Sequence, residues 1–316
     1  MNRPAAFTRD EQALAEAVRG YCHAKCTDDI QRAPGPPFPE QFWTGLAELG
    51  VFAMAVPSEE GGSGEILATA IELGHSVAPG PVPATFFAAH ALPADRIGGL
   101  VAGTELVSVG TAPLMPWAEI ADIHIEWTGA GAWVVRRVGA AEPVETLGNE
   151  PWARISVERE HPLERVAAAG DLFHLALAGY AVGAGRRVLD TAVDHARTRE
   201  QFGRTLGSFQ AVAHPLVDAS LELEAAEKLS ILAARATDEP HTDNRGLPAA
   251  ARLSASRAAM NAAFAAHQAL GAIGYSVEGP IGHITQRIRQ LTLPTGMDTE
   301  LEQQVLSGFS AERVEQ

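Results

Sequence analysis

The sequence predicts a mainly α-helical chain with a small β domain in its middle, and three observations support this fold class. Beyond Gly170, apolar residues recur three, four or seven positions apart, the spacing of one face of an α-helix. Between about Leu100 and Glu160 this period gives way to short β-rich runs. Before Leu100 the chain is again helical. We therefore expect three domains: helical over residues 1–99, β over 100–165 and a helical bundle over 166–316.

The first domain opens with a capping sequence at Thr8 to Glu11, where the threonine hydroxyl and the glutamate carboxylate can satisfy the first amides of a helix. Its expected helices run to about Cys26, from Glu40 to Leu49, from Glu65 to Val77 and from Pro83 to Leu92. Glycines at 61, 62 and 64 precede the third helix. No Lys-Ser/Thr pair follows them, so we interpret them as a turn and not as a phosphate loop.

The middle domain is expected to be small and made of short strands. Its β-rich runs are Leu106–Val109, Ile120–Trp127, Trp133–Val138 and Ala153–Val157. Gly129-Ala130-Gly131 separates the second and third runs and is typical of a hairpin turn. At about 60 residues this domain is conspicuously short.

Four helices are expected after Gly170, and small residues where they meet suit an antiparallel four-helix bundle. Their predicted ranges are Asp171–Thr198, Phe209–Thr237, Pro248–Leu270 and Ile281–Leu291. The inner stripe of the second helix is predicted to consist of Val212, Leu216, Ala219 and Leu223.

The stretch DHARTREQFGRTLGSFQ, from Asp194 to Gln210, links the first two long helices. It combines Arg199, an aromatic-glycine break at Phe202-Gly203 and a glutamine. Arginine offers a planar fork of donors to phosphate oxygens, so the stretch suits an anionic ligand. A plain helical hairpin with a glycine turn is the alternative, and spacing by itself favours that alternative.

Composition restricts the possible functions. The chain has 24 Lys+Arg against 39 Asp+Glu, a net charge of −15, which makes nucleic acid an unexpected partner. The two cysteines, Cys22 and Cys26, form neither a zinc pattern nor a disulfide framework. No histidine pair has metal-ligand spacing, and we expect no metal site. The N-terminus lacks a signal-peptide core, and no run reaches about 18 apolar residues, so we expect no membrane partner and a cytoplasmic location.

Two blocks of the sequence resemble the acyl-CoA dehydrogenase family. Arg199-x-Gln-Phe-Gly, followed by Phe209-Gln210, resembles a motif that contacts FAD in that family. About 60 residues later, HQALGAIGYSVEGP at 267–280 resembles the family's Q-x-x-G-G-x-G-[YF]-x-x-E-x-P. The resemblance implies the acyl-CoA dehydrogenase fold, with a helical N-terminal domain, a reduced β middle domain and a C-terminal four-helix bundle. It implies FAD as cofactor and α,β-dehydrogenation of an acyl-CoA thioester.

In that family the matching residues reach across a subunit interface to the pyrophosphate and adenosine of a neighbour's FAD. The cofactor-binding residues implied here are Arg199, Phe202, Gln210, Gln268, Gly271 and Ala272. Ala272 stands where the family has a second glycine. The family's T-E-x-x-x-G-S-D and K-x-x-I-T segments, which hold flavin and acyl-CoA in the middle domain, are not found. Trp117 could contact a flavin or could equally be a core residue.

The family's catalytic glutamate is missing at both of its usual positions. Gap-free counting puts these positions at Thr295 and Phe173, neither of which can accept a proton. Asp298 and Glu300 lie close by in sequence and are fallback candidates.

Within the family, two-subunit enzymes pair a short chain without a base with a complete one, and some act on steroid side-chain CoA esters. We therefore expect a non-catalytic half-site subunit: a chain that lends FAD contacts to a homologous catalytic subunit in an α2β2 complex with two flavins. A self-sufficient homomeric dehydrogenase using Asp298 or Glu300 and a flavin-free scaffold subunit are the alternatives.

Overall fold

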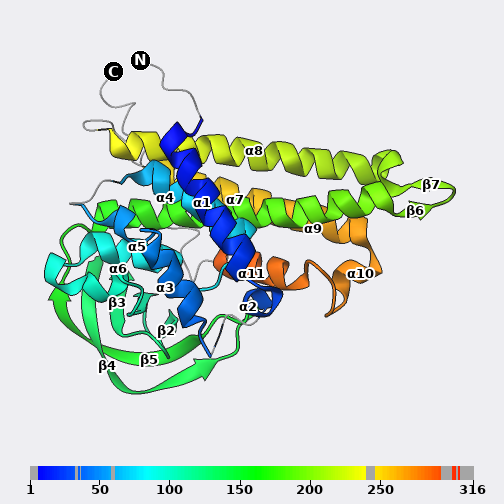
Figure 1. The fold of residues 1–316 in the computed structure, drawn as a ribbon. Helices are drawn as coiled ribbons and strands as arrows, with labels where there is room; N and C mark the ends of the chain where they lie inside the picture. The colour runs from blue at the N-terminus through cyan, green and yellow to red at the C-terminus, as the bar shows by residue number, and fades with distance from the viewer. Residues whose placement is uncertain are drawn as a thin grey trace.

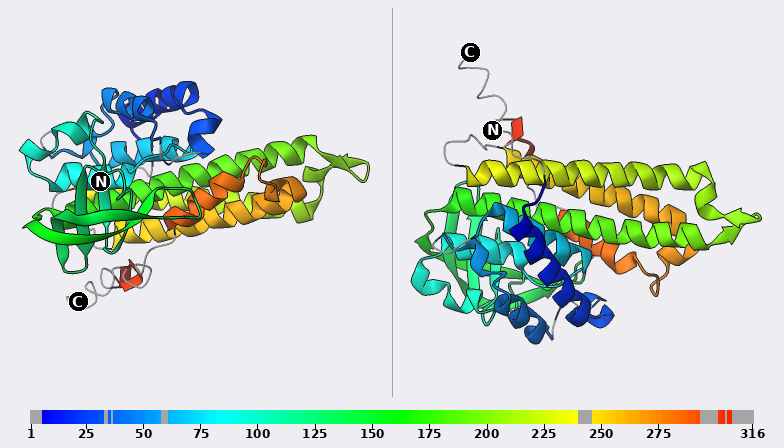
Figure 2. Two further views of the ribbon diagram at one scale, coloured as in Figure 1. Left: turned by 90° about the horizontal axis from the view of Figure 1, so that it is seen from below. Right: turned by 45° about the horizontal axis from the view of Figure 1, so that its top comes forward.

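The structure, a computed structural model of the 316-residue chain, describes residues 6–32, 35, 37–57, 61–239, 246–292, 301–303 and 305–306. Long helices form a rod, with a β-sheet and the short N-terminal helices gathered at one end of it (Figure 1). Two further views show the same arrangement, with a small hairpin at the opposite end (Figure 2). The mainly helical fold with a small sheet confirms the predicted fold class.

Short helices make up the N-terminal part. They are α1 (Arg9–Lys25), α2 (Asp28–Arg32), α3 (Glu40–Glu48), α4 (Ser63–His75), α5 (Val82–Ala91) and α6 (Gly98–Val101), with single 3-10 turns at Ala53–Ala55 and Ala94–Arg96. The predicted capping box is present, because Thr8 accepts from the amide of Glu11 and the Glu11 carboxylate accepts from the amide of Thr8. Gly61 and Gly62 lead directly into α4.

The middle part is one five-stranded sheet in the order β1-β3-β4-β5-β2. Its strands are β1 (Val107–Gly110), β2 (Leu114–Pro116), β3 (Ile123–Thr128), β4 (Gly131–Val144) and β5 (Trp152–Pro162). β1 and β3 are parallel, and the other pairs are antiparallel. The predicted hairpin turn joins β3 and β4. β4 and β5 are much longer than their apolar runs. β5 continues past Val157 with Glu158, which pairs with Arg136, and β4 continues past Val138 to a segment in which Glu142 lies opposite Arg154.

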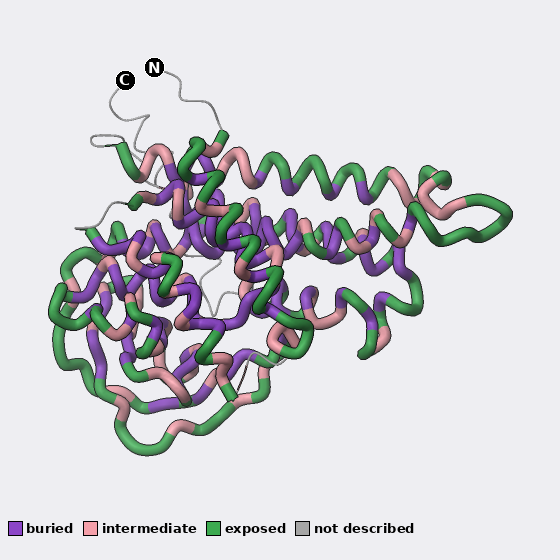
Figure 3. The backbone as a smooth tube through the Cα atoms, in the orientation of Figure 1, coloured by how far each residue is buried: buried purple, intermediate pink, exposed green. Residues whose placement is uncertain are grey.

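Long helices form the C-terminal bundle. They are α7 (Val166–Thr198), α8 (Gln210–Asp238), α9 (Leu247–Leu270), the single turn α10 (Ala272–Tyr275) and α11 (Gly282–Thr292). α7 begins five residues before its predicted start. It is long and apolar enough to cross a membrane, but 72% of its most apolar window is buried inside the protein. The tube in Figure 3 shows this burial along α7, while the outer face of α8 is exposed. A helix that is apolar on most sides is expected when other parts of the protein surround it, so burial explains the composition of α7.

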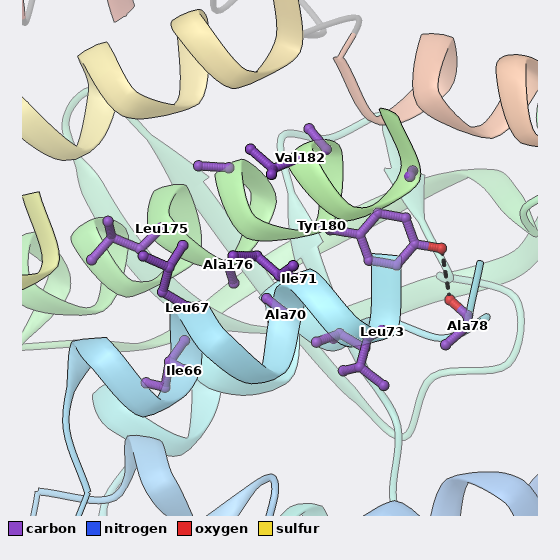
Figure 4. Packing of buried hydrophobic residues seen from close by; sticks show 14 of the residues in the cluster. Ile66, Leu67, Ala70, Ile71, Leu73, Ala78, Leu175, Ala176, Tyr180 and Val182 are labelled. Atoms are coloured by element: carbon purple, nitrogen blue, oxygen red, sulfur yellow. Dashed lines mark hydrogen bonds between the residues drawn. The ribbon is translucent and has the colours of Figure 1, made fainter. Parts of the chain in front are cut away.

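α4 packs along α7 at very short range and joins the N-terminal part to the bundle. A Cβ on Gly183 would lie 1.9 Å from the carbonyl oxygen of Ile71, so only glycine permits this approach. Figure 4 shows Leu67, Ala70 and Ile71 of α4 against residues of α7. At the end of the contact the hydroxyl of Tyr180 donates to the carbonyl of Ala78 at 2.9 Å. The two parts therefore share one continuous core.

The predicted inner stripe of α8 provides a stability test. Leu216 and Leu223 are both buried, whereas Leu221 on the same helix is 60% exposed. We expect Leu→Ala at 216 or 223 to lower the free energy of unfolding by about 2–5 kcal/mol, because each leaves a cavity. Leu221→Ala is the matched control and should change it by less than about 0.5 kcal/mol. Urea unfolding checks this, and losses below about 1 kcal/mol at both buried positions would contradict the assignment.

Candidate functional site

A cavity of about 100 Å³ lies where the N-terminal helices, the sheet and the bundle meet. Its walls are mostly apolar and aromatic, with a few charged or amide groups. It is lined by Gly80, Pro81, Pro83, Ala84, Val109, Gly110, Thr111, Leu114, Pro116, Trp117, Trp127, Glu150, Trp152, Phe173, Leu177, Arg252, Gln290 and Leu291. An apolar pocket with few polar groups is the usual form of a small-molecule site. Trp117, which sequence analysis left between two roles, is one of its wall residues.

Phe173, one of the two family base positions, contributes a phenyl ring to this cavity. The ring meets Trp127 edge-on at 5.4 Å between centroids. It is therefore part of an aromatic wall, where it cannot accept a proton. Thr295, Asp298 and Glu300 lie outside the described residues, so the prediction about them stays a prediction.

Glu150 is a carboxyl group on the cavity wall, in the loop before β5. One of its oxygens accepts a hydrogen bond from Gln290 Nε2 at 3.3 Å. Its other oxygen lies 3.9 Å from Nε of Arg287, a side chain that is itself only 2% exposed. Burial raises the pKa of the Glu150 carboxyl, with Arg287 acting in the opposite direction.

Arg252, on α9, brings a positive charge to the same cavity. Its Nη1 donates to Nδ1 of His174 at 3.2 Å. Burial, and to a lesser extent the charge of Arg252, lowers the pKa of His174 to about 3. An arginine has no acceptor, so the neutral imidazole must accept at Nδ1 and carry its proton on Nε2. The histidine therefore holds the guanidinium in place through this hydrogen bond.

The residues matching the FAD motif lie at the other end of the bundle. Arg199 is exposed at the end of α7 and begins a small hairpin, in which β6 (Glu200–Gln201) pairs with β7 (Arg204–Thr205). The sequence predicted only a glycine turn here. Both turn residues, Phe202 and Gly203, have positive φ, as a two-residue hairpin of this twist requires. Phe202 is 92% exposed. A bulky residue held in a strained conformation in solvent points to a contact outside this chain.

The other predicted cofactor residues gather near the base of this hairpin. Gln210 is the exposed first residue of α8, and no side chain caps the start of that helix. Uncapped amides at a helix start favour an anion such as a pyrophosphate. Gln268 is exposed on the last turn of α9. Gly271 follows with φ of 60°, a conformation suited to glycine, and Ala272 begins α10. The donor set fits a phosphate-bearing cofactor.

The hairpin and the cavity are too far apart to serve one ligand. Arg199 follows Phe173 by 26 residues along α7, which corresponds to about 39 Å at 1.5 Å per residue. Figures 1 and 2 agree, with the hairpin at the end of the rod away from the sheet. The structure thus brings the six motif residues to one end and leaves Phe173 at the other.

Four residues at or beside the cavity were not predicted from the sequence: Glu150, Arg252, Gln290 and Arg287. Two of them left a readable signal. Arg252 continues the buried alanine stripe of α9, three residues before Ala255, and Arg287 lies between the buried Ile284 and Ile288 of α11. A charged residue on an apolar stripe indicates a buried polar site. Glu150, in an irregular loop, left none. Among the described residues, no group of three or more His, Cys, Asp or Glu side chains could hold a metal ion.

Comparison with known proteins gives consistent matches. The family described as "Acyl-CoA dehydrogenase, C-terminal domain" matches residues 171–306, and the corresponding N-terminal domain matches residues 8–96. The chain is 34% identical to "Acyl-CoA dehydrogenase IpdE2" of Mycobacterium tuberculosis over an alignment of 254 residues that covers 76% of this chain and 78% of that protein.

Solved structures share the fold along nearly the whole chain. The "Tcur3481-Tcur3483 steroid ACAD G363A variant" superposes with a TM-score of 0.84 at 22% identity, covering 96% of this chain and 99% of that one. The "ChsE4-ChsE5 complex from Mycobacterium tuberculosis" gives 0.81 at 21% identity, with coverages of 99% and 100%. At such identities these likenesses show the fold alone.

Proposed function

Because this chain belongs to the acyl-CoA dehydrogenase family, we propose that it is the half-site subunit of a heteromeric, FAD-dependent acyl-CoA dehydrogenase. The family's cofactor is FAD and its reaction oxidises a CH–CH bond. In that reaction the flavin, when bound, takes up the hydride from the acyl group. This subunit supplies donors to the pyrophosphate and adenosine of the FAD held by a homologous catalytic subunit.

The separation between the motif and the cavity carries this proposal. Arg199 lies about 39 Å along α7 from the chain's own cavity, so a cofactor in that cavity is beyond its reach. Arg199, Gln210 and Gln268 are all exposed, and so is Phe202 in the turn of the β6–β7 hairpin. Exposed donors at the end of a rod suit a ligand that another subunit holds.

The absence of a base at position 173 supports the same proposal, in which the partner subunit supplies the catalytic base. Removal of an α-proton needs a group that can accept it within hydrogen-bond reach, and a phenyl ring cannot do so. The names of two solved neighbours each give two components, one as the ChsE4-ChsE5 complex and the other as a steroid ACAD. By analogy we propose an α2β2 complex acting on a lipid or steroid acyl-CoA.

Loss of Arg199 tests the assignment directly. Removing a charge-assisted contact to phosphate should weaken FAD binding to the assembled complex about ten- to hundredfold in Arg199→Ala. Arg9→Ala, on exposed surface of α1, is the matched control and should leave FAD affinity unchanged. The measurement is the flavin absorbance that remains bound per complex as the complex is diluted, which gives the FAD affinity. Equal FAD affinity in the wild type and in Arg199→Ala would disprove the contact.

One observation favours the self-sufficient alternative. The chain retains a cavity of its own with a carboxyl group, Glu150, on its wall. Glu150 therefore joins Asp298 and Glu300 as a possible base in a homomeric enzyme. The colour of the chain purified alone separates the two functions, since a self-sufficient enzyme keeps its FAD and is yellow.

A further inference from the structure

We propose that the seam between α2, α7 and the start of α11 binds a tetrahedral oxyanion, and that Arg32, Arg187 and His283 hold it. The ion is free sulfate or phosphate, or the phosphate group of a nucleotide. The three residues belong neither to the wall of the cavity nor to the β6–β7 hairpin, so the inference needs neither FAD nor the half-site function.

The first argument is an imidazole without a partner. His283 lies in the first turn of α11, and both of its ring nitrogens are shielded from solvent without a hydrogen bond to any described residue. At least one of these nitrogens carries a hydrogen, in the neutral ring and in the cation alike. A buried donor without a partner indicates a missing acceptor. The first amides of a helix also lack partners within that helix, which favours a negatively charged acceptor.

The second argument is that guanidinium groups meet beside this histidine. Arg32, at the end of α2, donates through Nη2 to the carbonyl of Gly279 at 3.3 Å, just before α11 begins. Arg287, one turn after the histidine on α11, donates through Nη2 to the carbonyl of Gln31 at 3.3 Å, and its Nε lies 3.9 Å from Glu150. These contacts hold α2 alongside the first turns of α11, as Figure 1 shows. α11 also packs against α7.

The third argument is an unbalanced positive charge. Burial lowers the pKa of His283 to about 4, and nearby guanidinium groups act in the same direction, namely those of Arg32, Arg287 and Arg187. The carboxylate of Asp28 opposes them, but it already pairs with Arg32 at 2.7 Å. Arg187, on α7, is exposed, and its side chain forms no hydrogen bond or ion pair with any described residue. An anion in the seam would supply its counter-charge.

A tetrahedral oxyanion suits these donors better than other ligands. Arginine offers a planar fork of N–H groups to sulfate or phosphate oxygens, and the imidazole N–H adds a donor from a third element. A cation would be repelled by the guanidinium groups, and a neutral ligand would leave Arg187 without a counter-charge. The start of α11 has room for the ion, because a Cβ built on Gly282 would approach Ser276 no closer than 3.7 Å.

The experiment is a calorimetric titration of the full chain with sodium sulfate, with sodium chloride keeping the ionic strength constant. We expect saturable binding in the millimolar range. Arg187→Gln should weaken sulfate binding about tenfold, the effect of one lost charge-assisted hydrogen bond. Because Arg187 is exposed, this variant should fold normally. Arg96→Gln removes an exposed arginine from the turn before α6, and as the matched control it should keep the wild-type affinity.

The donor role of His283 is tested by two variants. His283→Leu removes the imidazole N–H and should weaken sulfate several-fold, whereas His283→Gln keeps an N–H donor and should stay within about twofold of the wild type. Inorganic phosphate and AMP then identify the source of the oxyanion. AMP binding at least about tenfold more tightly assigns the site to a nucleotide, and equal affinities assign it to the free ion.

Three results would overturn the proposal. The first is equal sulfate affinity in the wild type and in Arg187→Gln. The second is loss of sulfate binding in Arg199→Gln, because the ion would then occupy the β6–β7 hairpin. The third is the lack of saturable binding by the folded chain, which would mean that water alone satisfies His283. None of these results bears on the half-site function, which depends on FAD binding to the assembled complex.

Discussion

The chain expressed alone should oxidise an acyl-CoA about 10²–10⁴-fold more slowly than the complex formed with its catalytic partner, the range that a general base contributes. Phe173 stands at one of the two positions of the family's catalytic base, and its phenyl ring at the cavity wall cannot accept a proton. Arg199, Gln210 and Gln268, meanwhile, have no FAD within reach unless another subunit presents one. The isolated chain should therefore also bind FAD weakly.

Flavin stoichiometry and turnover, measured for the chain alone and after co-expression with a homologous catalytic subunit, check this expectation. The complex should carry two flavins per four chains. A yellow homotetramer with ordinary enzyme rates from the chain alone would contradict the half-site assignment. In that case Glu150→Gln, Asp298→Asn and Glu300→Gln, each in the isolated chain, would show which carboxyl group serves as the base. Glu150→Gln is informative first, because Glu150 is the described carboxyl group on the cavity wall.

Much of the helical architecture could be predicted from the sequence, because it depends on local patterns. The stripe at Leu216 and Leu223 is buried as predicted, and α8 begins within one residue of its expected start. Sequence could not predict the length of β4 and β5, since their outer halves lack an apolar alternation and are held by cross-strand pairs. It also missed the β6–β7 hairpin, whose strands of two residues each are too short to show a period.

In the candidate site, too, the residues in local motifs could be predicted and those that depend on long-range packing could not. Arg199, Gln210 and Gln268 were found because they lie in local motifs. The cavity was not found, because its walls come from segments more than 100 residues apart, such as Gly80 and Leu291. Glu150 and Gln290 are 140 positions apart and meet only because α11 lies beside the loop before β5, where Gln290 also accepts from the amide of Gly148. No local spacing encodes such a contact. The family base positions were the exception, since alignment counting led to Phe173, which does line the cavity.

A neutral, buried His174 should make the protein acid-sensitive well above the range in which carboxylates titrate. Its pKa is about 3 in the folded chain against an ordinary value of 6.5. The folded state therefore binds fewer protons than the unfolded state, so this contribution is complete above about pH 6.5 and is lost as pH falls towards 3. The 3.5 pH units between these values, at about 1.4 kcal/mol each, give an upper limit of about 5 kcal/mol.

Urea unfolding between about pH 6.5 and 5 isolates this effect, because most carboxylates remain charged there. Over that interval the wild type should lose about 2 kcal/mol through His174. His174→Asn removes the titrating ring and keeps an acceptor for Arg252. Between these two pH values its free energy of unfolding should therefore fall by about 2 kcal/mol less than that of the wild type. Burial also lowers the pKa of His283, to about 4, and those of His90, His124 and His267, so some acid sensitivity will persist. His161→Asn, at an exposed position of β5, is the control and should keep the wild-type slope. If His174→Asn has that slope too, the imidazole is not held neutral by its surroundings, and the fixed guanidinium of Arg252 loses its explanation.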